Sequence, residues 1–233
     1  IGQASLFADE NGEDERIVNW KKAERWDDRT LYTLERDAFG FCLTGDMFDS
    51  YRVEARNFSI PFKDVRDSRE QQTIAGIVQS VRTIAGKRGT FAVVALSDGQ
   101  TTMDVLVFAK AYENYKDMLK PDEMLIFTGK GRKDERSGGM SFVCDKVITI
   151  EEMRVQKGAT LMLEIAEGQS LSAIRDLLHT GQNSDKGGVP CEVSISSKGV
   201  RAEVFLKDNY APTDQLLNQL KNSESVSSAR FVY

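Results

Sequence analysis

The sequence is poor in histidine, cysteine and long apolar runs, and each scarcity argues against a class of protein. His179 is the only histidine, so a metal centre or acyl-transfer triad built on histidine lacks its other members, and we interpret this residue as structural or surface. Cys42, Cys144 and Cys191 are odd in number and far apart, which argues against a disulfide framework or zinc site and indicates a reducing compartment. Apolar runs such as residues 91–96 are far too short to span a bilayer, and no signal peptide is visible.

Acidic residues outnumber basic ones, 36 to 31, and the formal net charge is −5. The chain therefore has no global attraction to nucleic acid or to an anionic membrane, and any such binding must come from a local patch. Phosphoryl transfer needs carboxylates that hold metal ions at the nucleotide, but the acidic residues are scattered over expected loops and solvated faces. The sequence also lacks a P-loop and a glycine-rich dinucleotide turn. We expect this chain to be non-catalytic and to hold no cofactor or metal.

The first third of the chain combines a polar tail with signals for short helices. Apolar residues at helical spacing predict a helix from Asp28, with Gly40 as its stop. A second short helix is predicted to follow, capped by Thr44 or Asp46. The chain begins abruptly with isoleucine instead of methionine, which suggests a piece cut from a longer protein.

The middle of the chain changes to the two-residue period of β-strands. The predicted strands lie at 73–84, 90–98, 101–108, 123–135 and 140–150, with a short helix at 110–119. Gly76 within the first strand indicates a bulge or a sharp bend. Three strands, a helix and two further strands, in this order, are typical of a five-stranded OB barrel.

The last third predicts a second, smaller domain with the order βαββαβ. Its strands are expected at 159–165, 189–196, 200–206 and 226–233, and its helices at 170–180 and 211–222. This order suggests a sandwich with both helices on one face of a small sheet. The fold class is therefore α+β and multidomain. We expect a flexible peptide, a helical and extended connector, the OB barrel and the C-terminal domain at 1–12, 13–70, 71–152 and 158–233.

The middle block resembles the OB domain of bacterial DNA polymerase III alpha subunits. The shared features are AG-x-V at 75–78, KRG at 87–89, VLVF at 105–108, GK at 129–130 and SGG at 137–139. The segment before this block resembles the one that precedes the family's OB domain, but Asp46-Met47 stands where the family has His-Pro. The resemblance covers nearly the whole chain. It implies a parent DNA-directed DNA polymerase whose Mg²⁺-dependent palm, thumb and fingers lie upstream.

The first residues contain the pattern Q-x-x-L-F, which resembles the peptide by which this family binds the sliding clamp (beta subunit). The predicted clamp-binding residues are Gln3, Ser5, Leu6 and Phe7. An extended peptide can place Leu6 and Phe7 in an apolar pocket of the ring, while the Gln3 amide forms hydrogen bonds at its rim. Their burial could contribute roughly 3–5 kcal/mol before ordering costs. The alternative is a chance match in which Leu6 and Phe7 pack locally.

OB barrels bind single strands on the face of strands 2 and 3, between the loop joining strands 1 and 2 and the loop joining strands 4 and 5. Both loops are basic here although the chain is acidic, so positive charge gathers where the barrel would meet the backbone of single-stranded template DNA. Phe91 and Phe142 are candidate stacking residues, but either could instead be a core residue, and the loops could be merely solvated turns. The predicted single-strand-binding residues are Arg82, Lys87, Arg88, Phe91, Lys130, Arg132, Lys133, Arg136 and Phe142.

The resemblance further implies that the C-terminal domain docks to the tau subunit of the clamp loader in a cytoplasmic, nucleoid-associated replisome. The predicted tau contacts are Leu216, Leu217, Leu220, Phe231, Val232 and Tyr233. The apolar spacing of the helix at 211–222 also fits a core face.

The function predicted overall is a coupling module of a replicative polymerase. One alternative is a stand-alone single-stranded nucleic-acid-binding OB protein, against which the acidic balance and sparse aromatics argue. Another is an enzyme, such as a nuclease or a tRNA-charging accessory that carries an OB domain.

Overall fold

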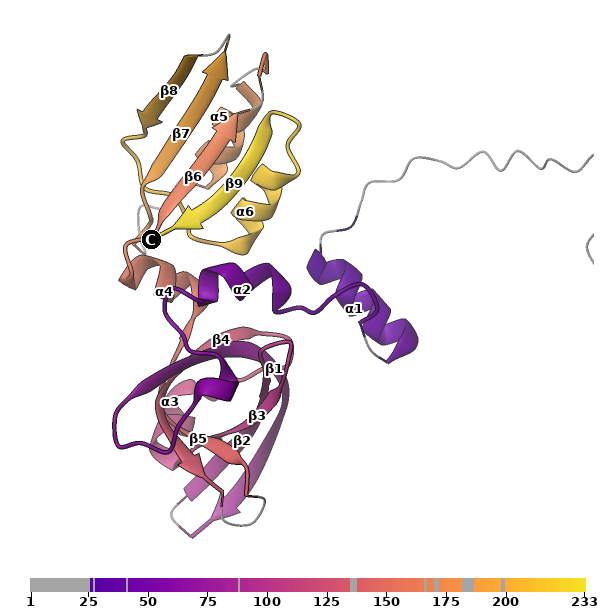
Figure 1. Cartoon of the computed structure of the whole chain (residues 1–233), viewed down its shortest axis with the longest axis vertical. Coiled ribbons are helices and arrows are strands. Elements are labelled where there is room, and N and C mark those ends of the chain that lie inside the picture. The colour runs from indigo at the N-terminus through magenta and orange to yellow at the C-terminus, as the bar shows by residue number, and fades with distance from the viewer. Residues whose placement is uncertain are drawn as a thin grey trace, which may run out of the picture.

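The structure is a computed structural model that describes residues 26, 28–40, 42–87, 89–134, 138–165, 167–169, 172–181, 187–197 and 200–233. Figure 1 shows a closed barrel and a separate small sheet, with two short helices, α2 and α4, between them. The predicted flexible peptide at 1–12 lies outside the described residues.

The barrel contains five strands and one short helix. These elements are β1 (Gln72–Gly86), β2 (Gly89–Ser97), β3 (Thr102–Val107), α3 (Ala109–Tyr115), β4 (Met124–Lys133) and β5 (Met140–Thr149). The strands close in the order β1-β2-β3-β5-β4, with β3 and β5 parallel and the other pairs antiparallel. The predicted five-stranded OB architecture is confirmed. Alternate residues of each strand point inward, so the core fills with aliphatic side chains and with Phe127 and Phe142.

Strand β1 belongs to two ladders, because its first half pairs with β4 and its second half with β2. The register against β2 shifts between Val78 and Ser80, so the bulge lies there and not at Gly76, where a bulge or a sharp bend was expected. Gly76 serves a close backbone approach instead. A Cβ at this position would lie 2.5 Å from the carbonyl oxygen of Ser97, which excludes any side chain.

The described residues of the second domain form four strands and two helices. They are β6 (Thr160–Ile165), α5 (Ser172–Thr180), β7 (Cys191–Ser197), β8 (Val200–Phe205), α6 (Asp214–Lys221) and β9 (Val226–Val232). The order βαββαβ is as predicted. The sheet order is β8-β7-β6-β9, in which β6 and β7 are parallel, so β8 and β9 form the two edges. Helices α5 and α6 contribute to the same apolar core against the sheet (Figure 1).

The connector before the barrel contains α1 (Asp28–Phe39), α2 (Asp49–Ala55) and the 3-10 turn η1 (Phe62–Asp64). Helix α1 ends before Gly40, whose φ of +83° fits the predicted stop. The predicted caps of the second helix are wrong. The N-cap position of α2 is Phe48, and Asp46 accepts a hydrogen bond from the Phe48 backbone N–H (2.7 Å) in the turn before it. Thr44 instead donates its hydroxyl proton to Glu35 (2.9 Å).

Helix α4 (Ile150–Gln156) follows β5 directly and was not among the predicted helices. Its start carries a capping box, in which the Thr149 hydroxyl accepts from the Glu152 N–H and the Glu152 carboxylate accepts from the Thr149 N–H. The T-x-x-E pattern is therefore the signal that could have located it. The apolar run of β5 continues into the helix, which hides the change of period.

Arg154 on α4 joins the connector, the barrel and the second domain. Its guanidinium is 1% exposed and pairs with both carboxylate oxygens of Glu54 on α2, at 2.7 and 2.8 Å. It also contacts Asp214 at 2.8 Å and donates to the carbonyl oxygen of Pro212 at 2.7 Å, both next to the start of α6. The Phe231 ring lies 4.2 Å from its Cζ atom. Burial disfavours its charge, but these acceptors outweigh burial and raise the pKa of Arg154.

Candidate nucleic-acid interface

The β1–β2 hairpin projects beyond the barrel core. Residues of β1 are buried as far as Val78, whereas the part that follows is exposed or half-buried up to the turn. Arg82 and Lys87 lie on this exposed part. Arg82 is 3.9 Å from Asp104 of β3, but both side chains are more than half exposed, so this pair leaves the guanidinium accessible.

Phe91 and Phe108 form an aromatic pair beside this hairpin. Their ring centroids are 6.0 Å apart at an interplanar angle of 44°. Phe108 is 47% exposed and Phe91 is half-buried on the outer face of β2, since the inner face belongs to Ala92, Val94 and Leu96. A base could stack on such an accessible ring.

The turn of the hairpin lies close to this pair. A Cβ at Gly89 would be 3.0 Å from the Cβ of Ala109, so the turn contacts the start of α3 directly after Phe108. Lys87 on the turn and Lys110 on α3 are both exposed. Neither Phe108 nor Lys110 was among the predicted contacts: Phe108 looked like the last residue of a strand, and Lys110 like the start of a separate helix. The period-two signal was present, since Val105 and Val107 face inward and the residue after them faces out.

A second basic group lies at the end of β4. Lys130, Arg132 and Lys133 are exposed there, and the Ser141 hydroxyl of β5 donates to the Arg132 carbonyl oxygen at 3.2 Å. Gly131 lies between Lys130 and Arg132. A side chain is excluded at this position, because a Cβ there would be 2.3 Å from the carbonyl oxygen of Arg66. In Figure 1 the β1–β2 turn and the facing ends of β4 and β5 lie at the end of the barrel away from the second sheet.

Of the remaining predicted single-strand contacts, two lie outside the described residues and one lies in the barrel core. Arg88 and Arg136 lie outside the described residues. Phe142 is wrong as a stacking residue, because its side chain is 0% exposed in the barrel core. Its inward position follows from the pairing of β5 with β3, opposite Val105.

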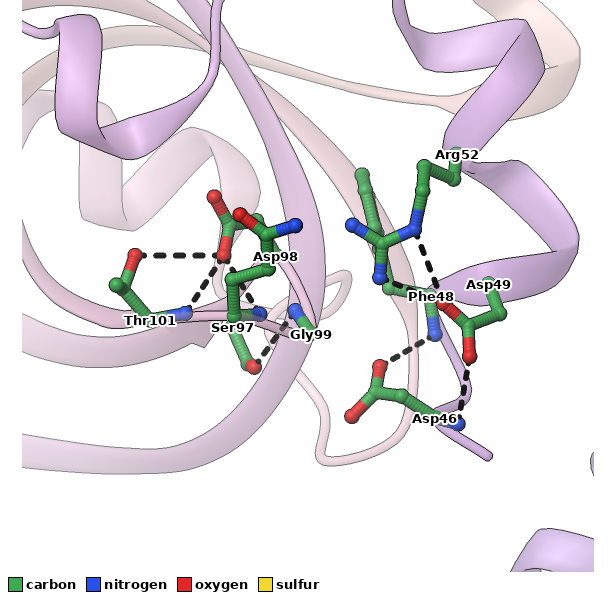
Figure 2. A network of polar contacts seen from close by, with 9 residues as sticks. Asp46, Phe48, Asp49, Arg52, Ser97, Asp98, Gly99 and Thr101 are labelled. Carbon is green, nitrogen blue, oxygen red and sulfur yellow. Dashed lines mark hydrogen bonds and ion pairs between the residues drawn. The ribbon is translucent and has the colours of Figure 1, made fainter. Parts of the chain in front are cut away.

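The β2–β3 turn is held by a network of hydrogen bonds near α2 (Figure 2). The Asp98 carboxylate accepts from the backbone N–H groups of Gln100 (3.0 Å), Thr101 (2.8 Å) and Phe62 (3.2 Å). The Ser97 hydroxyl accepts from the Gly99 N–H at 3.1 Å. These carboxylate and hydroxyl oxygens are occupied by the fold, so we assign this turn a structural role.

Two further carboxylates of Figure 2 lie at the start of α2: Asp46 in the turn before the helix and Asp49 as its first residue. Asp46 accepts from the Phe48 N–H, and Asp49 accepts from the Asp46 N–H at 3.0 Å. Asp49 also pairs with Arg52. Asp46-Met47, the departure from the family pattern, therefore forms an ordered turn in which Met47 is buried.

The predicted tau contacts on α6 are wrong. Leu216, Leu217 and Leu220 are buried in the core of the second domain, against strands and α5. The apolar side of this amphipathic helix thus faces the sheet and forms part of the core.

The predicted tau contacts on β9 and after it are partly accessible. Val232 and Tyr233 are exposed over more than a third of their surface, and Phe231 is half-buried beneath Arg154. Tyr233 donates its hydroxyl proton to Glu54 at 2.6 Å. Burial and this hydrogen bond raise the pKa of Tyr233, so the hydroxyl stays protonated and the contact keeps its form at neutral pH.

The predicted clamp contacts Gln3, Ser5, Leu6 and Phe7 lie outside the described residues. Within the described part of the chain, no group of three or more histidine, cysteine, aspartate or glutamate side chains is arranged to hold a metal ion. No helix in that part is long and apolar enough to cross a membrane.

Comparison with known proteins finds a family model that matches the barrel and relatives that match most of the chain. The OB-fold nucleic acid binding domain family (tRNA_anti-codon) matches residues 72–155. The DNA polymerase III subunit alpha of Neisseria meningitidis serogroup B is 28% identical over 212 residues, which are 89% of this chain and 18% of that protein. That of Escherichia coli K12 is 26% identical over 230 residues, which are 95% of this chain and 20% of that protein.

The chain thus spans about a fifth of the length of these curated relatives. Among solved structures, RecG bound to a three-way DNA junction matches 35% of this chain and 11% of its own, with 21% identity and a TM-score of 0.31. Residues 72–155 thus match the OB-fold nucleic acid binding domain family, and the chain as a whole is similar to a C-terminal region of DNA polymerase III alpha subunits.

Proposed function

We propose that the barrel binds single-stranded template DNA as part of a replicative polymerase. The observation that carries this proposal is the aromatic pair of half-buried Phe91, on the basic β1–β2 hairpin, and exposed Phe108, with the basic end of β4 at the same end of the barrel. Cationic side chains attract the phosphate backbone, and an aromatic ring offers a stacking surface to any base. The binding is therefore expected to be salt-dependent and tolerant of sequence.

Base stacking on the aromatic pair and phosphate binding by the cations should have different measurable effects. Stacking of one base on Phe108 should contribute about 1–3 kcal/mol, which corresponds to a weakening of roughly five- to 150-fold on truncation. Removing one cation that binds a phosphate should reduce the salt slope by about 0.7 for a single strand. With one accessible aromatic pair among the described residues of the barrel face, we expect modest affinity, in contrast to a dedicated single-strand-binding protein.

The experiment is fluorescence anisotropy of a labelled oligo(dT) at several salt concentrations. Phe108→Ala should weaken binding without changing the salt slope, whereas Lys87→Ala with Lys110→Ala should flatten the slope. Lys157→Ala, at the exposed C-cap of α4 and outside the barrel strands, is the matched control and should leave both unchanged. Equal slopes in all variants would mean that the basic turns are only solvated. Tight binding by the wild-type chain would favour the stand-alone single-strand-binding alternative.

We extend the proposal to two protein partners on the strength of the similarity to alpha subunits. The Q-x-x-L-F pattern at Gln3–Phe7 supports a tether to the sliding clamp, and the similarity to alpha subunits supports docking of the second domain to the tau subunit of the clamp loader. With the α6 leucines buried, Val232 and Tyr233 are the predicted contacts that stay accessible. The parent chain would be a Mg²⁺-dependent DNA-directed DNA polymerase in the cytoplasm, and this region its non-catalytic coupling module.

A further inference from the structure

Strand β8 forms a free edge of the second sheet. It pairs with β7 on one side, and no strand of the described chain pairs on the other. The Leu206 N–H donates to the Cys191 carbonyl oxygen at 3.0 Å, which fixes the direction of the backbone groups. Because these directions alternate along an antiparallel strand, the N–H and C=O groups of Arg201, Glu203 and Phe205 point away from β7. The edge therefore presents unused hydrogen-bonding groups in a regular row.

The side chains of β8 are exposed on both faces of the sheet. Val200 is 69%, Val204 43% and Phe205 72% exposed. Val204 also lines an apolar groove of about 280 Å³ between this edge and α5, with Ile174 and Leu178 on its helix side. Monomeric proteins seldom leave an edge strand both unpaired and apolar, because such an edge recruits a further strand.

The sequence of β8 is complementary to itself in antiparallel register. Consider two copies related by a two-fold axis that passes midway between their Ala202 residues. Arg201 of each copy then stands opposite Glu203 of the other, and Val200 stands opposite Val204. The outward backbone groups of Arg201 and Glu203 then exchange hydrogen bonds across the axis. In one copy the same two side chains pair along the strand at 3.5 Å and are both more than half exposed. Opposite charges and apolar pairs thus meet in a single register.

We propose that the partner of the β8 edge is β8 of a second copy of this chain. The two four-stranded sheets then join into one continuous sheet with isologous contacts. Charge complementarity points to a second copy as the partner, because Arg201 and Glu203 have opposite signs and face each other across the axis. Two charges of the same sign at these positions would make the strand repel its own copy. One strand pair is small for an interface, so the dissociation constant should be on the order of tens of micromolar.

The experiment is sedimentation equilibrium of the 233-residue chain over a range of concentrations. Glu203→Arg places arginines opposite each other across the axis, and Arg201→Glu places glutamates there, so each variant alone should dimerise at least tenfold more weakly. An equimolar mixture of the two variants restores opposite charges at both positions and should dimerise within a few-fold of the wild type. Glu224→Arg makes the same charge change on an exposed residue outside the sheet and should leave the dimer intact.

Three outcomes would overturn the proposal. The first is a wild-type chain that stays monomeric at several hundred micromolar, which would leave the edge to a strand of another protein. The second is a dimer that neither charge variant weakens, which would place its interface elsewhere. The third is a mixture of the variants that stays monomeric, which would show that the register is wrong. Circular dichroism of each variant confirms that the exposed substitutions leave the fold intact.

Discussion

Replacing Arg154 by methionine tests the junction between the barrel and the second domain. The guanidinium is 1% exposed, and its two carboxylate partners, Glu54 and Asp214, lie on segments far apart in the sequence. Arg154→Met keeps much of the side-chain length but leaves both carboxylates without their cation. Breaking a buried ion pair in this way costs about 3–5 kcal/mol of the free energy of unfolding. Typical domains have only about 5–15 kcal/mol, so the loss should be obvious.

The assay is urea denaturation followed by circular dichroism, with the free energy of unfolding extrapolated to water. The matched control is Arg230→Met, which removes an exposed pair with Glu164 at 3.3 Å and should cost less than about 1 kcal/mol. The double variant Arg154→Met, Glu54→Met removes both charges of the Arg154–Glu54 pair. It should recover part of the lost free energy of unfolding, because no unpaired charge then remains at that contact. If Arg154→Met costs no more than the control, the buried pair does not stabilise the junction and our reasoning about it is refuted.

Two further predictions concern acid stability and the N-terminal peptide. Hydrogen bonds from Arg36 lower the pKa of Asp122 below its ordinary value of 3.8. The resulting stability is present above pH 3.8 and is lost as the pH falls through the lower folded pKa. Asp122→Asn, which tolerates the φ of +67° there, should remove this acid-dependent part, and an unchanged pH profile in thermal melts would contradict it. Leu6→Ala with Phe7→Ala should abolish binding to a bacterial sliding clamp, measured by surface plasmon resonance, while DNA binding persists; loss of both would argue against separate modules.

Local sequence patterns were sufficient to define the strands and helices of the barrel and of the second domain, and their order. Period-two alternation and turn residues defined the five barrel strands, and the helical spacing after Pro212 defined α6. These signals are local, because strand and helix periods depend on neighbouring residues. Where two periods meet without a break, as at the passage from β5 into α4, the local signal was ambiguous and only the T-x-x-E pattern marked the helix.

Which apolar and charged side chains are free was set by the three-dimensional packing. Phe142 and Phe108 look alike in the sequence, but closure of β5 against β3 buries one, while the other stands exposed just past the end of β3. The position of Arg154 within a charged stretch gave no sign that it would be buried between Glu54 and Asp214, residues 100 and 60 positions away. Burial and pairing are set by contacts between distant segments, and no local pattern records which segments will meet.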